Sequence, residues 1–354
     1  MQERLLDFLI CPECHGGEAL SVQRFLSDGD RVIDGAILCN SCRTRFPVIG
    51  GIPRLLPHDL RAELAQTHQA WFREHSFPQD NSTPDGTDGS DTNKVFRTMQ
   101  SFGYQWNVFD EVYEQWHQDF LSYLPSPVKK DFFQGKTGLD AGCGMGRHTR
   151  VATQLGAELV AMDLSNAVEA AYRNTVDLPN AHVIQADLSR PPLRSEMFDF
   201  VYSFGVLHHL PVPLKGFRSL ASLPKKGSPL FIWVYSDTKH WVYEQIRQFS
   251  TRIPFSTLRI LCLILAIGVW ICFVTPHRLV RWSDFKMLTG YMKFKRYADY
   301  PFRALYADFF DELSAPIIHG HKEKELRGWF EQDGYNQVTT SSTGGLGWRG
   351  YGVR

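Results

Sequence analysis

The middle of the chain alternates short apolar segments with segments of helical periodicity. The apolar segments are TGLDAG (137–142), ELVAMD (158–163), HVIQAD (182–187), FDFVYSF (198–204) and PLFIWVY (229–235), and the helical ones are GRHTRVATQLG (146–156), SNAVEAAYRNT (165–175) and LKGFRSLASL (214–223). Apolar strands joined through helices by short turns predict an α/β fold, with a parallel sheet covered by helices on both faces. A last helix (321–334) and two strands (335–342 and 347–354) follow.

The remaining patterns divide the chain into three parts. Residues 1–57 contain short strands and Gly-rich turns and predict a small domain. Residues 58–75 have apolar residues at helical spacing and 76–93 are almost entirely polar, so 58–93 is predicted to be a connecting helix followed by a flexible linker. Residues 94–354 then form the large domain, which a helical, partly apolar insertion over 237–316 interrupts.

Composition sets broad limits on the class of protein. Of the 354 residues 43% are hydrophobic and 21% charged, which excludes a wholly disordered chain and a multi-span membrane protein. Lys plus Arg and Asp plus Glu both total 38, so a chain-wide electrostatic grip on nucleic acid is not favoured. The first thirty residues contain no apolar run of the secretory type, and we expect a cytoplasmic location. The oligomeric state stays open.

Four of the seven cysteines form two C-x-x-C pairs, Cys11 with Cys14 and Cys39 with Cys42. Each pair presents two sulfurs from one tight turn, so together they predict a structural zinc site with four thiolate ligands. The alternative is that these cysteines are simply buried thiols. The segments CPEC and CNSC and the phrase FPVIGGIPRLLP that follows them resemble the small zinc-ribbon activator of methyltransferases that act on tRNA, rRNA and release factors, over residues 5–57. The resemblance implies a zinc-ribbon platform fused to a methyltransferase.

A glycine-rich turn follows the first strand of the large domain. The phrase GLDAGCGMGRHT has glycines at 142, 144 and 146, which permit a tight turn and close approach of the backbone to a ligand. Asp163 and Asp187 end the next two strands, at the sheet edge where open α/β folds bind ligands. A nicotinamide enzyme is an alternative, although DAGCGMG departs from the G-x-G-x-x-G pattern, and Asp187 has the alternative role of a helix cap.

Residues 95–236 and 320–354 resemble the class I S-adenosylmethionine-dependent methyltransferases in these motifs. The resemblance implies a Rossmann-like sheet, parallel except for an antiparallel last strand, with S-adenosylmethionine as cofactor. It assigns Asp140 and the glycine loop to the methionine moiety, Asp163 to the ribose and Asp187 to the adenine edge.

The fourth strand of the large domain ends in SFGVLHHLP, which places Ser203, His208 and His209 over the reacting end of the cofactor. Methyl transfer is an in-line displacement, so the protein positions the acceptor and, where the acceptor carries a proton, supplies a base. Either histidine is a candidate base, and a purely structural turn is the alternative. The absence of an Asn-Pro-Pro-Tyr or Asp-Pro-Pro-Tyr sequence here argues against amide or base-amine acceptors and favours oxygen or carbon.

Further candidates for acceptor contacts come from outside this motif. Residues 102–116 are rich in aromatic side chains, among which Tyr104 and Trp106 are candidates to cover cofactor and substrate, with core packing as the alternative. Tyr235, at the end of the fifth strand, and His319 are the others, and a surface or capping role is the alternative for the histidine.

Residues 260–274, ILCLILAIGVWICFV, form an uncharged apolar run that is shorter than the roughly 20 residues needed to cross a bilayer. A single crossing would also place strands of one sheet on opposite sides of the membrane. Nine Lys or Arg and one acid, Asp284, lie between Arg247 and Arg296, a local charge of +8. We expect residues 253–296 to contact an anionic membrane surface on the cytoplasmic face, and a buried lid helix or a dimer face is the alternative.

The sequence therefore predicts an S-adenosylmethionine-dependent methyltransferase that acts on a small-molecule, lipid-linked or glycan-linked acceptor, with O- or C-methylation favoured. Two alternatives stay open. One is a tRNA or protein methyltransferase, and the other is a scaffold protein that binds the cofactor without catalysis.

Overall fold

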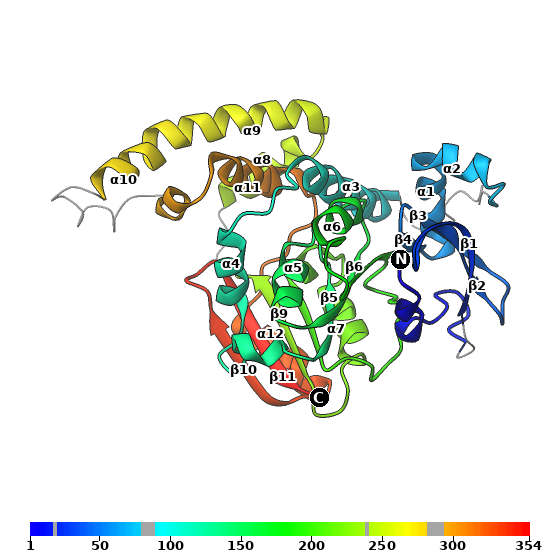
Figure 1. Ribbon diagram of the computed structural model, residues 1–354. Coiled ribbons are helices and arrows are strands. Elements are labelled where there is room, and N and C mark those ends of the chain that lie inside the picture. The colour runs from blue at the N-terminus through cyan, green and yellow to red at the C-terminus, as the bar shows by residue number, and fades with distance from the viewer. Residues whose placement is uncertain (17–19, 79–88, 238–240, 282–293) are drawn as a thin grey trace.

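The computed structural model describes residues 1–16, 20–78, 89–237, 241–281 and 294–354 (Figure 1). Its strands form one sheet of eleven in the order β1-β2-β3-β4-β7-β6-β5-β8-β9-β11-β10. The strands are β1 (Leu20–Asp28), β2 (Arg31–Cys39), β3 (Arg45–Ile49), β4 (Ile52–Leu55), β5 (Thr137–Ala141), β6 (Glu158–Asp163), β7 (Ala181–Ala186), β8 (Phe200–Phe204), β9 (Pro229–Tyr235), β10 (Asn336–Ser342) and β11 (Gly347–Val353).

The predicted Rossmann-like sheet is confirmed. Strands β5 to β9 pair in parallel, because their near-continuous apolar residues are buried on both faces. The last strand, β11, pairs antiparallel with β9 and with the edge strand β10. Helices α5 (Arg147–Gln154), α6 (Val168–Thr175), α7 (Pro213–Ala221) and α12 (Glu323–Gln332) cover this part of the sheet and match the predicted helical segments.

The N-terminal ribbon, residues 1–57, joins the sheet of the large domain. Strand β4 pairs in parallel with β7, with Arg54 opposite Gln185. Arg54 is buried, its guanidinium donates to Gln185 Oε1 at 3.1 Å, and it forms an ion pair with Glu169. Phe8 stacks on Phe198 with ring centroids 5.8 Å apart, so the ribbon shares one hydrophobic core with the large domain.

The predicted connecting helix is two short helices, α1 (Arg61–Thr67) and α2 (Gln69–Glu74). Most of the predicted linker, 79–88, lies outside the described residues. Its last part is wrong as a linker, because residues from Gly89 belong to helix α3 (Gly89–Val108). A polar first turn carries no apolar signal, and the helical spacing becomes visible only from Val95 onward.

The insertion after β9 is helical, as predicted. It contains α8 (Trp241–Ser250), α9 (Phe255–Val269), a π-helical turn (Trp270–Val274), α10 (Thr275–Val280) and α11 (Phe302–Ser314). Together with α3 and α4 (Gln115–Tyr123), these helices stand over the carboxyl ends of the parallel strands (Figure 1). They close the space in which an α/β sheet binds its ligands.

Candidate active site

A cavity of about 820 Å³ lies between the carboxyl edge of the sheet and the helices above it. Such a volume accommodates a cofactor and a small acceptor together. Seven of the residues predicted from the sequence line it: Trp106, Gly142, Gly144, Asp163, Asp187, His209 and Tyr235.

The glycine loop and Asp163 form one end of this cavity. Gly142 and Gly144 have φ of +86° and +53°, which a side chain would strain, and a Cβ on Gly142 would lie 2.3 Å from Val206. The carboxylate of Asp163 accepts hydrogen bonds from the Gly144 N–H at 2.9 Å and from the Ser165 N–H and hydroxyl at 2.8 and 2.7 Å. Burial raises the pKa of Asp163 and these hydrogen bonds lower it. The arrangement fits an adenosyl ligand whose ribose hydroxyls meet this carboxylate.

Asp187 lines the cavity and also holds a local turn, and the described chain forms no helix between it and β8, so the alternative of a helix cap is not met. Its Oδ1 accepts the Ser189 N–H at 2.8 Å, as in a local turn, and its Oδ2 pairs with Arg190 Nε at 3.1 Å. Arg190 also pairs with Asp59 at 2.9 Å, so the segment after the ribbon reaches this corner of the cavity. Asp187 still lines the cavity next to Leu188, where an adenine edge would lie.

The aromatic residues of 102–116 divide between the cavity and the core. Trp106 covers Gly144, since a Cβ there would lie 3.2 Å from the indole Nε1. The guanidinium of Arg147 lies 5.2 Å from the Trp106 ring and 4.6 Å from the Trp116 ring. The prediction for Tyr104 is not met, because its ring packs against Phe255 and Phe310 outside the cavity.

Of the two predicted histidines, His209 lines the cavity and His208 does not. The Nδ1 of His209 lies 2.8 Å from the carbonyl oxygen of Ile317, which can only accept, so Nδ1 carries the proton and Nε2 keeps its lone pair. Burial lowers the pKa of His209 to about 4, so the ring is neutral near pH 7. His208 is fully buried and does not line the cavity, and its ring stacks on Tyr235 with centroids 4.0 Å apart.

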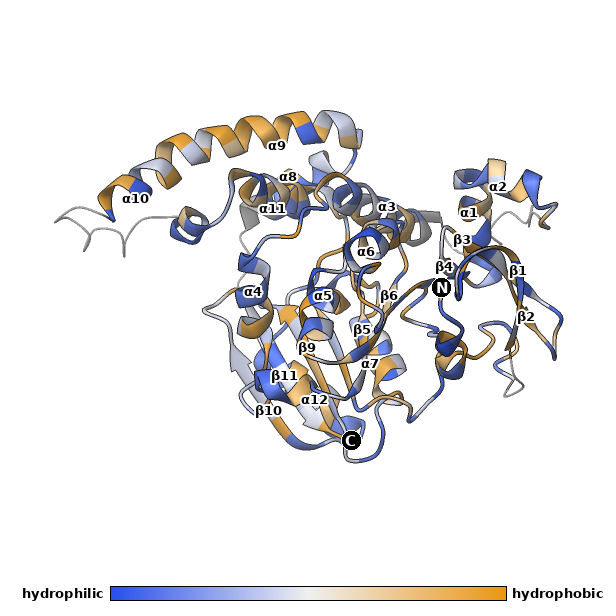
Figure 2. Cartoon of the chain, in the orientation of Figure 1, coloured by the Kyte–Doolittle hydropathy of each residue, from blue (hydrophilic) through white to orange (hydrophobic). Residues whose placement is uncertain are grey.

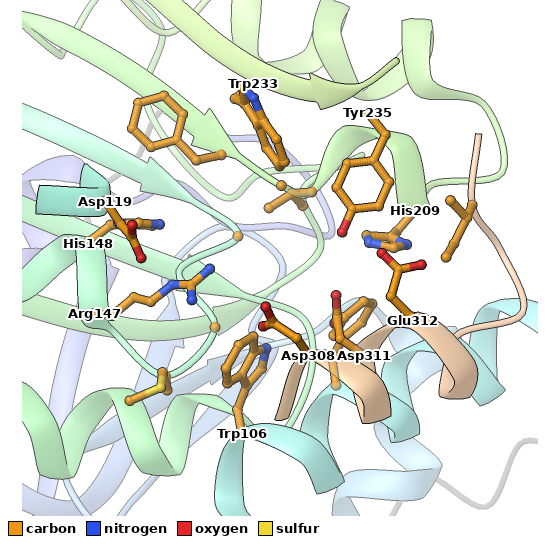
Figure 3. A pocket seen from close by; sticks show the side chains of 18 of the residues that line it. Trp106, Asp119, Arg147, His148, His209, Trp233, Tyr235, Asp308, Asp311 and Glu312 are labelled. Carbon is orange, nitrogen blue, oxygen red and sulfur yellow. The ribbon is translucent and has the colours of Figure 1, made fainter. Parts of the chain in front are cut away.

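Helix α11 contributes three carboxyl groups that the sequence analysis missed: Asp308, Asp311 and Glu312. In Figure 3, Asp311 and Glu312 point toward the part of the cavity that holds His209 and Tyr235. Burial and the neighbouring carboxylates raise the pKa of Asp311 to about 7. Asp308 instead accepts the Tyr297 hydroxyl at 2.5 Å and forms an ion pair with Arg296. A carboxyl with a strongly perturbed pKa in a cavity that also holds a histidine is typical of a reacting centre.

The four paired cysteines form a second site, in the ribbon. All four sulfurs lie within 4.8 Å of one another, and both the Cys11–Cys42 and the Cys14–Cys39 sulfurs are 3.6 Å apart. A zinc ion at about 2.3 Å from four thiolates would hold them about 3.8 Å apart. The cluster therefore fits a tetrahedral zinc ion with no open position, and its role would be structural.

Comparison with known proteins agrees with this geometry. Residues 139–232 match the methyltransferase domain family, and residues 2–51 match the Trm112p-like proteins. The chain combines a methyltransferase domain with a Trm112p-like domain. Both predicted resemblances are thereby confirmed, and the methyltransferase domain supports S-adenosylmethionine as its cofactor.

Individual relatives differ in what they methylate. The ubiquinone biosynthesis O-methyltransferase of Haemophilus ducreyi is 27% identical over 142 residues, covering 35% of this chain and 60% of the relative. The tRNA (carboxymethyluridine(34)-5-O)-methyltransferase of Saccharomyces cerevisiae is 28% identical over 110 residues, covering 30% and 37%. The chain thus spans less than two thirds of these relatives. Among solved structures, a complex of the Haloferax volcanii Trm112 activator and a putative methyltransferase matches with 13% identity and a TM-score of 0.39, covering 75% of this chain and 94% of that one.

Four further predicted residues of the methyltransferase domain do not line the cavity and make structural contacts near it: Asp140, Gly146, Ser203 and His319. Asp140 accepts the hydroxyls of Thr149 and Tyr202 at 2.7 and 2.9 Å, and burial raises its pKa to about 7. The Ser203 hydroxyl donates to the Ala141 carbonyl at 2.7 Å, which ties β8 to β5. Asp140 and Ser203 lie within β5 and β8, where side chains point to the faces of the sheet, so they bond to neighbouring elements there and not to a ligand in the cavity.

Gly146 and His319 are likewise structural in position. A Cβ on Gly146 would lie 3.0 Å from the Ala171 Cα, so this glycine permits α5 to pack closely on α6. The backbone N–H of His319 donates to the His208 carbonyl at 2.8 Å. This hydrogen bond holds the segment before α12 against the turn that contains His208 and His209.

We expect one zinc ion per chain in the Trm112p-like domain. Cys39→Ser should lose the metal and loosen residues 1–57, because three thiolates do not complete the tetrahedron. The exposed Cys272, far from the cluster in sequence, gives the matched control Cys272→Ser, which should keep the metal. Metal analysis and limited proteolysis measure both effects, and less than about 0.2 zinc per wild-type chain would contradict the prediction.

Proposed function

We propose that the methyltransferase domain transfers the methyl group of S-adenosylmethionine to a hydroxyl of a small-molecule, lipid-linked or glycan-linked acceptor. The observation that carries the proposal is the polar end of the cavity, where His209, Tyr235, Asp311 and Glu312 surround the space beyond the glycine loop (Figure 3). An alcohol must lose its proton as its oxygen attacks the methyl carbon, and this end of the cavity supplies the acceptors for that proton.

Asp311 is the residue we assign to accept the proton. A base works best when its pKa lies near the working pH, and burial places the pKa of Asp311 at about 7, whereas His209, at about 4, is a weak base. The same burial, with the α11 carboxylates, raises the pKa of Tyr235 well above its usual value, so its hydroxyl stays protonated and can donate to the acceptor oxygen. The lone pair on His209 Nε2 can accept a hydrogen bond from a second hydroxyl of the acceptor.

The cofactor supplies the electrophilic methyl group when it is bound. The residues of the chain then hold the two reactants in line. Asp163 and the glycine loop would hold the adenosyl end, and Trp106 and Trp116, with Arg147 lying over both rings, line the cavity between the two ends.

Labelling of extracts tests the choice of acceptor. Purified enzyme is incubated with cofactor that carries an isotopically labelled methyl group and with separated lipid, small-molecule, protein and RNA fractions, and mass spectrometry locates the label. We expect the label on an oxygen in the lipid or small-molecule fraction. Label on RNA or protein would contradict the proposed acceptor, and bound cofactor without transfer to any fraction would indicate a scaffold.

A further inference from the structure

The helical insertion exposes a long apolar face. Helix α9, the π-helical turn and α10 form one continuous helix, Phe255–Val280, which is long and apolar enough to cross a membrane. Only 22% of its most apolar stretch is buried, whereas a core helix would be mostly buried. The large apolar residues that it exposes are Ile260, Leu261, Ile264, Leu265, Ile267, Ile271, Phe273 and Leu279.

The figures place this face at the outside of the molecule. In Figure 2, α9 lies along the outer side of the insertion, away from the sheet, and hydrophobic residues occupy most of its length. The uncharged residues 260–274 lie inside a longer helix of 26 residues, so length alone does not exclude a crossing. A single crossing is nevertheless incompatible with the fold. Strand β9 precedes this helix, β11 follows it, and the two strands are hydrogen-bonded neighbours in one sheet.

The opposite side of the same helix lies one layer from the cavity. Ala266 and Val274 are buried against Tyr297 and Leu305, and both of these residues also line the cavity. Near its start, Leu258 and Cys262 pack on Phe310 of α11, the helix that carries Asp311. The exposed apolar face and the end of the cavity that holds Asp311 are therefore separated only by the packing of this helix on α11 and on Tyr297.

Charge on this part of the chain has a single sign. No Asp or Glu occurs between Glu244 and Asp284, while Arg252, Arg259, Arg278 and Arg281 flank the apolar stretch. The local +8 of the sequence is partly neutralised, since Arg281 pairs with Asp299 at 2.5 Å and Arg296 pairs with Asp308. Arg247 lines the cavity, and Lys286 and Lys293 lie outside the described residues. Arg252 and Arg259 before the apolar face, and Arg278 after it, lie outside these ion pairs, although Arg278 also donates to the Ala298 and Tyr300 carbonyls. The apolar face between these arginines is what carries the inference.

We infer that Phe255–Val280 docks the protein on an anionic membrane, lying in the plane of the interface with its exposed apolar face in the lipid. An apolar face between basic ends matches the acyl chains and the anionic headgroups of such a surface. A second copy of this chain matches less well, because self-pairing through this face would bring arginines together with no carboxylate on the helix to meet them.

Docking in this way would deliver an amphiphilic acceptor to the cavity directly from the membrane. This consequence rests on the proposed function, whereas the docking does not. A lipid-linked acceptor would keep its chain in the bilayer beneath the helix and present its hydroxyl to the reacting end one layer away.

Vesicle co-sedimentation of the full chain tests the docking without any methyl transfer. The vesicles are phosphatidylcholine alone, or phosphatidylcholine with an equal part of phosphatidylglycerol. We expect the wild type to bind the anionic vesicles about tenfold more tightly than the neutral ones, with release at high salt. Ile264→Glu with Ile271→Glu should weaken binding to the anionic vesicles by tenfold or more, on the order expected for two charges in the acyl region.

A matched control separates docking from general hydrophobicity. Leu26 of the ribbon is 54% exposed, close to the 61% and 62% of Ile264 and Ile271, and Leu26→Glu should leave vesicle binding unchanged. Calorimetric cofactor binding confirms that each variant is folded. Equal binding by wild type and the double variant, or no binding by either, would overturn the inference. So would a wild-type dimer that the double variant converts to monomers while vesicle binding is absent, since the face would then pair two copies.

Discussion

Replacing Asp311 by asparagine should lower kcat for the labelled acceptor by 10²- to 10⁴-fold, the range of a lost general base. Asparagine keeps the shape of the side chain and an oxygen that can accept the hydrogen bond with Gln105, but it cannot take up a proton. Cofactor affinity, measured by calorimetry, should change little, because Asp311 belongs to α11 and the glycine loop with Asp163 forms the other end of the cavity. A loss of cofactor affinity equal to the loss of kcat would instead assign Asp311 to cofactor binding or to folding.

His209→Asn is the companion variant. The asparagine Nδ2 can replace the histidine Nδ1 as donor to the Ile317 carbonyl, so the turn stays anchored while Nε2 is lost. If Asp311 is the base, this variant should lose about tenfold or less in kcat, as for one neutral hydrogen bond. A larger loss in His209→Asn than in Asp311→Asn would transfer the role of the base to the histidine.

The pH dependence of kcat/KM distinguishes the same two residues independently. The ionised form of Asp311 is the one that accepts a proton, and its pKa is raised to about 7, so activity should rise with pH through about 7 and level off above it. A base at His209, with a pKa lowered to about 4, would already be fully active at pH 6. A flat wild-type profile between pH 6 and 8 would therefore contradict the assignment of Asp311.

The sequence predicts the sheet well because each parallel strand is buried on both faces and reads as an apolar run. It predicts much less about how the ribbon attaches. The pairing of β4 with β7 is made by backbone groups and by Arg54, which meets Gln185 and Glu169 more than a hundred residues away. No local pattern marks such a contact, so the sequence predicts the ribbon but not its attachment to the sheet.

For the candidate site residues too, the sequence predicts the region correctly but not which side chain of a neighbouring pair lines the cavity. Tyr104 and Trp106 are two positions apart on a helix, and residues at that spacing do not share a face, so one meets the core and the other the cavity. His208 and His209 are adjacent in one turn and point in different directions for a similar reason. Periodicity predicts that one member of each pair faces inward, but only the packing decides which.

Asp311 could not be found from a motif. It lies in FRALYADFFDELS, a helix of an insertion whose place over the sheet depends on α3, α8 and α9. One signal was present, namely three acids among the apolar residues of an amphipathic helix, of which Asp311 and Glu312 are adjacent. Recognising it required the knowledge that this helix covers the carboxyl edge of the sheet.

Replacing Asp163 by alanine should weaken cofactor binding by about 2 to 3 kcal/mol, or roughly 30- to 140-fold, because two ribose hydroxyls lose a charged acceptor. The structure adds a second consequence, since the same carboxylate holds the Gly144 N–H of the glycine loop. Ser165→Ala is the control for that consequence. It removes one hydroxyl from the Asp163 carboxylate and leaves its charge in place, so it should cost about 1 kcal/mol or less. Calorimetry on the wild type and both variants decides. If Asp163→Ala binds as tightly as the wild type, Asp163 only braces the loop and the ribose lies elsewhere in the cavity.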